Sequence, residues 1–208
     1  MSKLVNDLIR KGYLKSERVI DAFSEINRIE FVPDEFRLQS DANVALPIGH
    51  GQMIPDPLVA SIAFELLEPY EGCSILCVNS GLGWIAALSA YVTGENGAVI
   101  SLEKNANLEK LGKFNADKYG YVKKNIIKFF LYKKGIEKGE HENEFPVDRI
   151  LIFNEKENSV EEFRQFLKIG GKLVISIDGN LTYIERKSED EFYAEKYPGF
   201  SLASMFVE

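Results

Sequence analysis

The chain has 208 residues, of which 45% are hydrophobic and 27% are charged, so it can bury a large core, and disorder along most of its length is excluded. Its net charge of -7 argues against a nucleic-acid partner, because binding to phosphates depends on accumulated lysine and arginine. No run of eighteen apolar residues occurs and no apolar leader opens the chain, so we expect no membrane partner and a cytoplasmic location.

The first seventy residues are predicted to be mainly helical. Ser16 is a good N-cap for a helix with an apolar stripe that includes Phe23 and Ile26. Further along, Asp56 and Pro57 together are typical of a helix start, with an acidic cap and a proline at the first helical position. We expect a second amphipathic helix to begin there.

From residue 74 onward, short apolar runs alternate with amphipathic stretches. The runs lie at residues 74–78, 98–102, 126–131, 149–153 and 172–177. The stretches are predicted helices at residues 84–92, 105–119 and 159–167, closed by Gly94, Gly120 and Gly170. Such alternation indicates βαβ units, and therefore an α/β fold with a doubly wound, mostly parallel sheet and helices on both faces.

The chain has two cysteines: Cys73 flanks the first of these runs, and Cys77 lies within it. Residues four apart on a strand share a face but lie roughly 13 Å apart, which is too far for a disulfide. We interpret both as buried apolar side chains. The two histidines, His50 and His141, are distant in sequence and belong to no ligand motif, so no metal site is predicted.

In a doubly wound sheet the ligand lies beyond the carboxyl ends of the strands, where the first strand turns into its helix. Residues 79–83 form this turn, and Gly81 and Gly83 permit its tight backbone conformations. Glu103 follows twenty residues after Gly83, at the end of the next strand, where an acid can accept hydrogen bonds from ribose hydroxyls. Taken alone, this pattern fits a ligand site and a purely structural turn equally well.

A lysine-rich stretch interleaved with aromatic residues surrounds the third apolar run. Its members are Lys123, Lys124, Lys128, Lys133, Lys134 and Lys138, with Phe129, Phe130 and Tyr132 among them. The pattern allows a nucleic-acid surface, but a core strand with solvated flanks is the favoured interpretation. The charged residues at 137–143 are predicted to form the least ordered loop.

Five motifs occur in the order and with the spacing of one protein family. They are RIEFVP at residues 28–33, LPIGHGQMI at 46–54, GAVISLE at 97–103, VDRI at 147–150 and LKIGGKLV at 167–174. Over residues 1 to about 186 the chain thereby resembles the protein-L-isoaspartate O-methyltransferases. The resemblance implies one domain over residues 1–208 with a fold of the S-adenosylmethionine-dependent methyltransferase (Rossmann-like) type. Residues 1–70 would form a helical and substrate-loop segment, and residues 71–208 the core.

The family transfers a methyl group from S-adenosylmethionine to the side-chain carboxylate of L-isoaspartyl residues, a step of protein repair. The resemblance therefore implies S-adenosylmethionine as cofactor and isoaspartyl-containing proteins or peptides as partners. It places Gln52 and Ile54 at the isoaspartyl cleft. The residues that it places at the methyl donor are Asn79, Ser80, Gly81, Gly83 and Glu103.

Several positions depart from the family pattern. Pro55 stands at the family serine position, so no catalytic residue is assigned, and Cys77 matches an acid. Leu131, Tyr132 and Lys133 stand where the family has Gly-Asp-Gly, whose acid binds the adenine. Each lost polar contact weakens binding by about 1–3 kcal/mol.

These replacements leave two main hypotheses about activity. The first is a divergent but active carboxyl methyltransferase. The second, which the replacements favour, is a catalytically degenerate protein that keeps the fold to bind a protein partner or another ligand. A third hypothesis, a nucleic-acid-associated methyltransferase, rests on the lysine-rich stretch alone.

Overall fold

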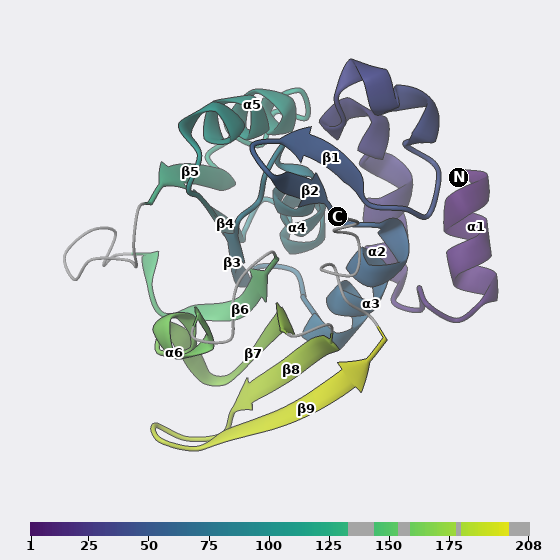
Figure 1. Cartoon of the computed structure of the whole chain (residues 1–208). Helices are drawn as coiled ribbons and strands as arrows, with labels where there is room; N and C mark the ends of the chain where they lie inside the picture. The colour runs from purple at the N-terminus through teal and green to yellow at the C-terminus, as the bar shows by residue number, and fades with distance from the viewer. Residues whose placement is uncertain (133–143, 154–158, 178–179, 200–208) are drawn as a thin grey trace.

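The computed structural model describes residues 1–132, 144–153, 159–177 and 180–199 (Figure 1). The N-terminal segment is helical, as predicted. It contains α1 (Lys3–Arg10), α2 (Glu17–Glu25) and the 3-10 helices η1 (Arg28–Phe31) and η2 (Asp34–Gln39). Ser16 is the N-cap residue of α2, but its hydroxyl donates to Glu65 at 2.7 Å instead of capping the helix.

A short hairpin follows, which the sequence did not predict as strands. It consists of β1 (Leu46–Gly49) and β2 (Gln52–Ile54), paired antiparallel with Leu46 opposite Ile54. Three consecutive residues with positive φ form its turn: Gly49 at 86°, His50 at 54° and Gly51 at 71°. The predicted helix start after the hairpin is confirmed, because the Asp56 carboxylate accepts the Val59 N–H at 2.8 Å at the start of α3 (Pro57–Leu67).

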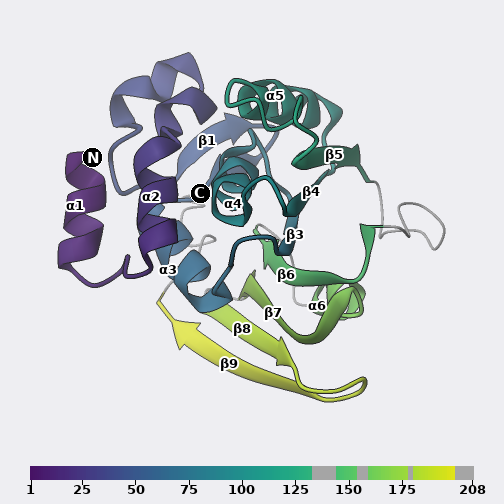
Figure 2. The ribbon, with the colours of Figure 1, turned by 180° about the vertical axis from the view of Figure 1, so that it is seen from behind.

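The predicted mostly parallel sheet is confirmed, and the described residues contribute seven strands to it. They are β3 (Ser74–Val78), β4 (Ala98–Glu103), β5 (Ile127–Leu131), β6 (Val147–Ile152), β7 (Leu167–Ile177), β8 (Asn180–Arg186) and β9 (Phe192–Pro198). The spatial order is β5-β4-β3-β6-β7-β8-β9. The first five strands in this order pair in parallel. At the other end of the sheet, β8 pairs antiparallel with β7, and β9 pairs antiparallel with β8 (Figure 2).

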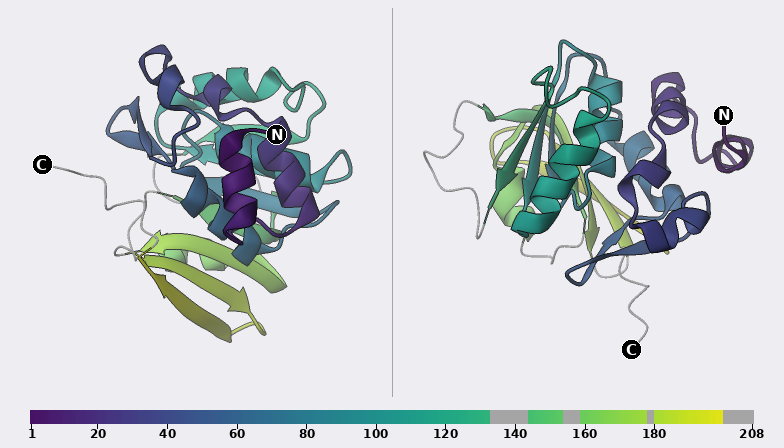
Figure 3. Two further views of the ribbon diagram at one scale, coloured as in Figure 1. Left: turned by 90° about the vertical axis from the view of Figure 1, so that its right-hand side faces the viewer. Right: turned by 90° about the horizontal axis from the view of Figure 1, so that it is seen from above.

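Helices cover both faces of the sheet, as expected. The remaining ones are α4 (Trp84–Thr93), α5 (Ala106–Asp117) and α6 (Ser159–Arg164). Figure 3 shows α5 and α6 on opposite sides of the sheet. Along β3, Ile75 and Cys77 pack into the cluster with α1 to α5, while Leu76 and Val78 pack into the other cluster with Phe163 of α6. Burial on both faces explains why these strands are continuous apolar runs in the sequence.

The last predicted helix requires a correction. Helix α6 ends at Arg164, and β7 already begins at Leu167. Gly170, expected to close the helix, lies inside β7 with φ 78°. The pairing of β7 with β6 shifts register in this region, since Val147 pairs with Leu167 and Arg149 with Lys172. Gly170 and the adjacent Gly171 allow this irregularity. The spacing of the apolar residues before them fits a helix and a strand equally well.

The predictions for the cysteines and the lysine-rich stretch are confirmed where the structure describes them. Both cysteines are free and buried, and burial raises the pKa of the Cys77 thiol to about 12. Lys128 contacts Glu144 at 2.5 Å, and Phe129 between the lysines is buried in the core. Lys133, Lys134, Lys138 and the loop at 137–143 lie outside the described residues. No helix in the described ranges is both long and apolar enough to span a membrane.

Candidate functional site

The turn at residues 79–83 and Glu103 lie at the same edge of the sheet, as the sequence predicted. The two adjacent strands β3 and β4 are parallel, so their carboxyl ends meet there, and the Gly81 N–H donates to Glu103 Oε2 at 2.9 Å. Asn79, Gly81 and Gly83 have φ values of 55°, 55° and 89°. This left-handed backbone explains why glycine and asparagine occupy these positions.

A glycine in α5, which the sequence analysis did not single out, makes the turn possible. A Cβ on Gly83 would lie 2.7 Å from the Gly112 carbonyl oxygen, and a Cβ on Gly112 would lie 2.8 Å from the Gly81 carbonyl oxygen. The helix and the turn therefore pack backbone against backbone. The sequence did carry a signal for this contact, namely a glycine in the middle of a predicted helix. Glycine lowers the stability of a helix, so its presence there indicates that close packing requires it.

The Glu103 carboxylate is fully buried and held by neighbouring donors. Its Oε1 accepts hydrogen bonds from Gln52 Nε2 at 2.9 Å, Lys104 N–H at 2.8 Å and Asn105 N–H at 3.0 Å. Its Oε2 accepts one described hydrogen bond, from Gly81. Oε1 already accepts three donors and Oε2 only one, so Oε2 is the oxygen that can accept a further donor. The acid is thus fixed in position and still able to bind a hydroxyl.

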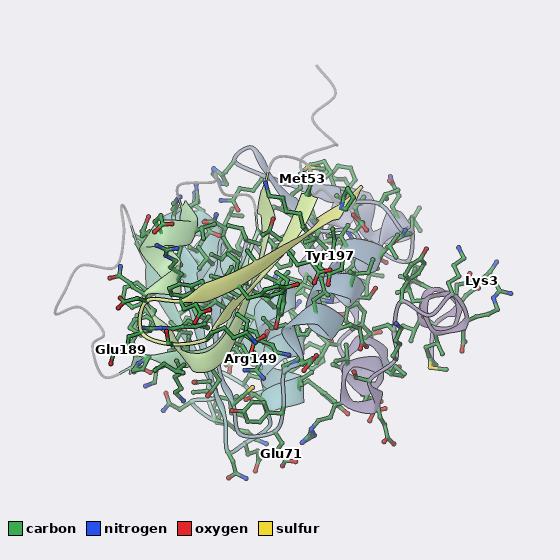
Figure 4. The ribbon with its side chains drawn as sticks, turned by 90° about the horizontal axis from the view of Figure 1, so that it is seen from below. Lys3, Met53, Glu71, Arg149, Glu189 and Tyr197 are labelled. Atoms are coloured by element: carbon green, nitrogen blue, oxygen red, sulfur yellow. The ribbon has the colours of Figure 1, made fainter. Side chains whose placement is uncertain are left out.

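The β1–β2 hairpin lies over this turn. The Cδ1 atom of Ile48 is 2.5 Å from the place where a Cβ on Gly81 would stand, and Gln52 reaches Glu103. Gln52 Oε1 is buried and accepts no hydrogen bond from any described residue. Ile54, which the resemblance assigned to the isoaspartyl cleft, ends β2, and its side chain is buried in the core. Figure 4 shows Met53 of β2 and Glu71, just before β3, on opposite sides of the molecule.

A buried arginine, which the sequence analysis did not assign to the site, holds the base of the hairpin. Arg28 is 5% exposed, and its guanidinium donates to the carbonyls of Ser40 at 3.1 Å, Val44 at 2.8 Å and Pro55 at 3.0 Å. Its Cζ lies 5.3 Å from the centre of the Trp84 ring. Burial lowers the pKa of Arg28 to about 10, so the group remains charged at neutral pH. The arginine therefore fixes the chain before and after the hairpin.

The ends of β5, β3 and β6 are joined by a chain of side-chain hydrogen bonds. The Tyr132 hydroxyl donates to Asn79 Oδ1 at 3.0 Å, and Asn79 Nδ2 donates to the Phe153 carbonyl at 3.0 Å. Lys104 Nζ lies 5.3 Å from the centre of the Tyr132 ring, and Phe163 meets that ring edge-on at 6.2 Å. This tyrosine bridge (Tyr132, Asn79 and Phe153) crosses the carboxyl edge of the sheet.

Two further residues of the first strand and its turn face inward. The Cys77 thiol lies 3.4 Å from Ser89 Oγ of α4, and Ser80 Oγ lies 2.6 Å from Ser101 Oγ of β4. Neither side chain projects from the edge, so the turn offers its backbone to a ligand. No group of three or more histidine, cysteine, aspartate or glutamate side chains in the described ranges is arranged to hold a metal ion.

Comparisons with known proteins agree over nearly the whole chain. The family model "Protein-L-isoaspartate(D-aspartate) O-methyltransferase (PCMT)" matches residues 1–199. A protein-L-isoaspartate O-methyltransferase from Methanopyrus kandleri is 31% identical over 210 residues, covering 99% of this chain and 91% of its own length. One from Thermococcus sibiricus is 33% identical over 175 residues, covering 84% of this chain and 76% of its own length.

Solved structures show the same fold. A crystal structure of a Plasmodium falciparum protein, described as a protein-L-isoaspartate O-methyltransferase in complex with S-adenosyl-L-homocysteine, has a TM-score of 0.77 at 20% identity. The similarity covers 93% of this chain and 92% of that protein. From the extent of the family match and the identity to the archaeal relatives, the chain belongs to the protein-L-isoaspartate(D-aspartate) O-methyltransferase family.

Proposed function

We propose that this chain transfers the methyl group of S-adenosylmethionine to the side-chain carboxylate of L-isoaspartyl residues in proteins. The observation that carries the proposal is the hydrogen bond from Gln52 to Glu103, which joins the hairpin to the acid at the carboxyl edge of the sheet. Through this bond, the acid that would accept the ribose and the β1–β2 hairpin that covers the acid form one site. Family membership supplies the reaction and the substrate class.

Two parts of the site fit the methyl donor. Glu103 Oε2 keeps acceptor capacity, so it can accept a ribose hydroxyl. The turn at residues 79–83 presents backbone from which Cys77 and Ser80 point away, which suits a close approach of the methionine part. We therefore assign the donor to Asn79, Ser80, Gly81, Gly83 and Glu103.

In this reaction, the residues of the chain mainly position the two reactants and exclude water from them. Bound S-adenosylmethionine supplies an electrophilic methyl group on its sulfonium. An isoaspartyl carboxylate is already ionised at neutral pH, so no residue of the chain has to remove a proton from it. The requirement is an approach to within about 3–3.5 Å in line, which depends on the hairpin. Arg28 holds the Pro55 carbonyl and thereby fixes the end of the hairpin over the edge.

The test is transfer of labelled methyl from S-adenosylmethionine to an isoaspartyl peptide, with the matched aspartyl peptide as control. We expect base-labile label on the isoaspartyl peptide alone, and we expect Glu103→Gln to lose most of it. Glu17→Gln, on an exposed residue of α2, is the matched control variant. Absence of transfer by the unaltered chain, under conditions in which a relative methylates the same peptide, would refute the proposal.

A second candidate is a degenerate member that binds a protein partner without turnover. Two observations favour it: the tyrosine bridge crosses the carboxyl edge, and Pro55 offers neither a hydroxyl nor an N–H to a substrate. Calorimetry separates the candidates when it is combined with the transfer assay. Binding of S-adenosylhomocysteine with isoaspartyl-specific transfer supports the enzyme, whereas absence of both supports the binding protein.

A further inference from the structure

The place of the base in a nucleoside bound at this edge follows from the order of the strands. A ligand of a doubly wound sheet extends from the glycine turn of the first strand across the acid that ends the next strand. Here these strands are β3 and β4, and β5 lies on the far side of β4. A nucleoside whose ribose contacts Glu103 therefore carries its base toward the end of β5, where Tyr132 stands.

Tyr132 directly follows β5 and is held in place by several contacts. It is 7% exposed, and its backbone N–H donates to the Glu103 carbonyl at 3.0 Å, so the tyrosine is directly beside the acid. The Lys104 ammonium lies over the ring, and Phe163 meets the ring edge-on. The hydroxyl reaches Asn79, which belongs to the turn itself. A flat aromatic ring, with a cation over it, thus stands at the end of β5 beside the acid.

We propose that Tyr132 determines the affinity of the site for its nucleoside, because the ring occupies the base subsite and has to leave before an adenosyl group binds. The inference rests on the proposed function, since that function supplies the nucleoside. Opening the subsite breaks the hydrogen bond to Asn79 and the contacts of the ring with Lys104 and Phe163. The apparent affinity is then reduced by the fraction of molecules in which the ring has moved.

The experiment titrates S-adenosylhomocysteine into the full chain and into three variants by calorimetry. Tyr132→Ala removes the ring, and Tyr132→Phe removes only the hydroxyl. Tyr119→Phe is the matched control, because the Tyr119 hydroxyl also takes part in a hydrogen bond, which it accepts from the Asn27 N–H at 3.0 Å in another part of the fold. Fluorescence of Trp84, the single tryptophan, gives a second readout at the first residue of α4.

We expect Tyr132→Ala to lower the dissociation constant about tenfold, which corresponds to removal of a closed state ten times more populated than the open one. Tyr132→Phe should lower it less, because the ring remains, and Tyr119→Phe should leave it unchanged. Binding by Tyr132→Ala where the unaltered chain shows none would support the proposal in its strongest form. Thermal unfolding checks that each variant is folded, and Tyr132→Leu replaces the alanine variant if that one is not.

Weaker binding by Tyr132→Ala would overturn the proposal, since the ring would then support the base instead of occupying its place. Equal binding by all variants, or none by any folded variant, would overturn it as well. The methyl-transfer assay keeps the two claims separate. Transfer by the unaltered chain, together with weaker binding by Tyr132→Ala, leaves the proposed function standing and refutes the role of the ring. Tighter binding without transfer by any variant supports the ring and refutes the enzyme.

Discussion

One buried charged residue holds the hairpin and another holds the carboxyl edge of the sheet. The first is a hydrogen-bond donor and the second is an acceptor. Arg28 donates to backbone carbonyls on both sides of the hairpin, whereas Glu103 accepts from backbone N–H groups of the edge and from Gln52. All the described bonds of Arg28 are to the chain's own backbone. Glu103 keeps one acceptor position. We infer that the arginine serves the fold and that the acid serves both the fold and a ligand.

The largest effect is expected on replacing the arginine. Arg28→Met leaves four buried or half-buried carbonyls without their donor and should lower the free energy of unfolding by about 3 kcal/mol or more. Urea unfolding measures this loss. Arg37→Met is the control, since Arg37 makes one long hydrogen bond, to Ile29 at 3.4 Å, and should change stability by less than about 0.5 kcal/mol. Equal losses in the two variants would contradict the role given to Arg28.

Replacing the acid should affect ligand binding more than stability. Glu103→Gln removes the charge and turns a donor group toward backbone N–H groups, so the free energy of unfolding should fall by about 1–2 kcal/mol. The dissociation constant of S-adenosylhomocysteine should rise about tenfold or more, because a hydrogen bond to a charged acceptor is lost. Calorimetry measures the second change. Lost stability with an unchanged dissociation constant would make Glu103 a structural residue only.

Removing the hydrogen bond between the hairpin and the carboxyl edge should reduce donor binding less than it reduces methyl transfer. Gln52→Ala removes the hydrogen bond to Glu103, so the hairpin is no longer tied to the edge. We expect transfer to an isoaspartyl peptide to fall about tenfold, while donor affinity changes about twofold. Met53→Ala, on the same strand, is the matched control and should change both by less. Equal losses of affinity and transfer in Gln52→Ala would show that Gln52 acts only on the donor.

The smallest effect is expected far from both regions, at the start of β6. Burial alone would raise the pKa of Asp148, but hydrogen bonds from Ser74 and Lys168 outweigh it and lower the pKa to about 2. The folded pKa is below the unfolded value of about 3.9, so this stabilisation is present above pH ~4 and is lost as the pH falls toward 2.

Asp148→Asn should therefore lower the free energy of unfolding at pH 7 by less than about 1 kcal/mol, because the group is partly exposed. The difference from the unaltered chain should shrink as the pH falls from 4 toward 2. Urea unfolding at several pH values measures it. A difference that stays constant over this window would show that the carboxylate of Asp148 does not titrate with a lowered pKa.

The contrast between the two regions also explains what the sequence predicted. Burial on both faces makes the parallel strands visible as apolar runs, and the glycine turn and Glu103 follow from their place at strand ends. The hairpin has strands of four and three residues, too short for a clear alternation, and β8 and β9 were not foreseen either. The bond from Tyr132 to Asn79 spans 53 residues, so sequence alone showed a replaced acid and not its new partner.

If the hairpin and the carboxyl edge form one site, a ligand bound at one of them should change the affinity of the other for its own ligand. S-adenosylhomocysteine is titrated into the unaltered chain without and with a saturating isoaspartyl peptide. Because Gln52 links the two regions, we expect the isoaspartyl peptide to lower the dissociation constant of S-adenosylhomocysteine and the aspartyl peptide to leave it unchanged. Equal dissociation constants with and without the isoaspartyl peptide, while Glu103→Gln still weakens binding, would show that the two regions do not form one site.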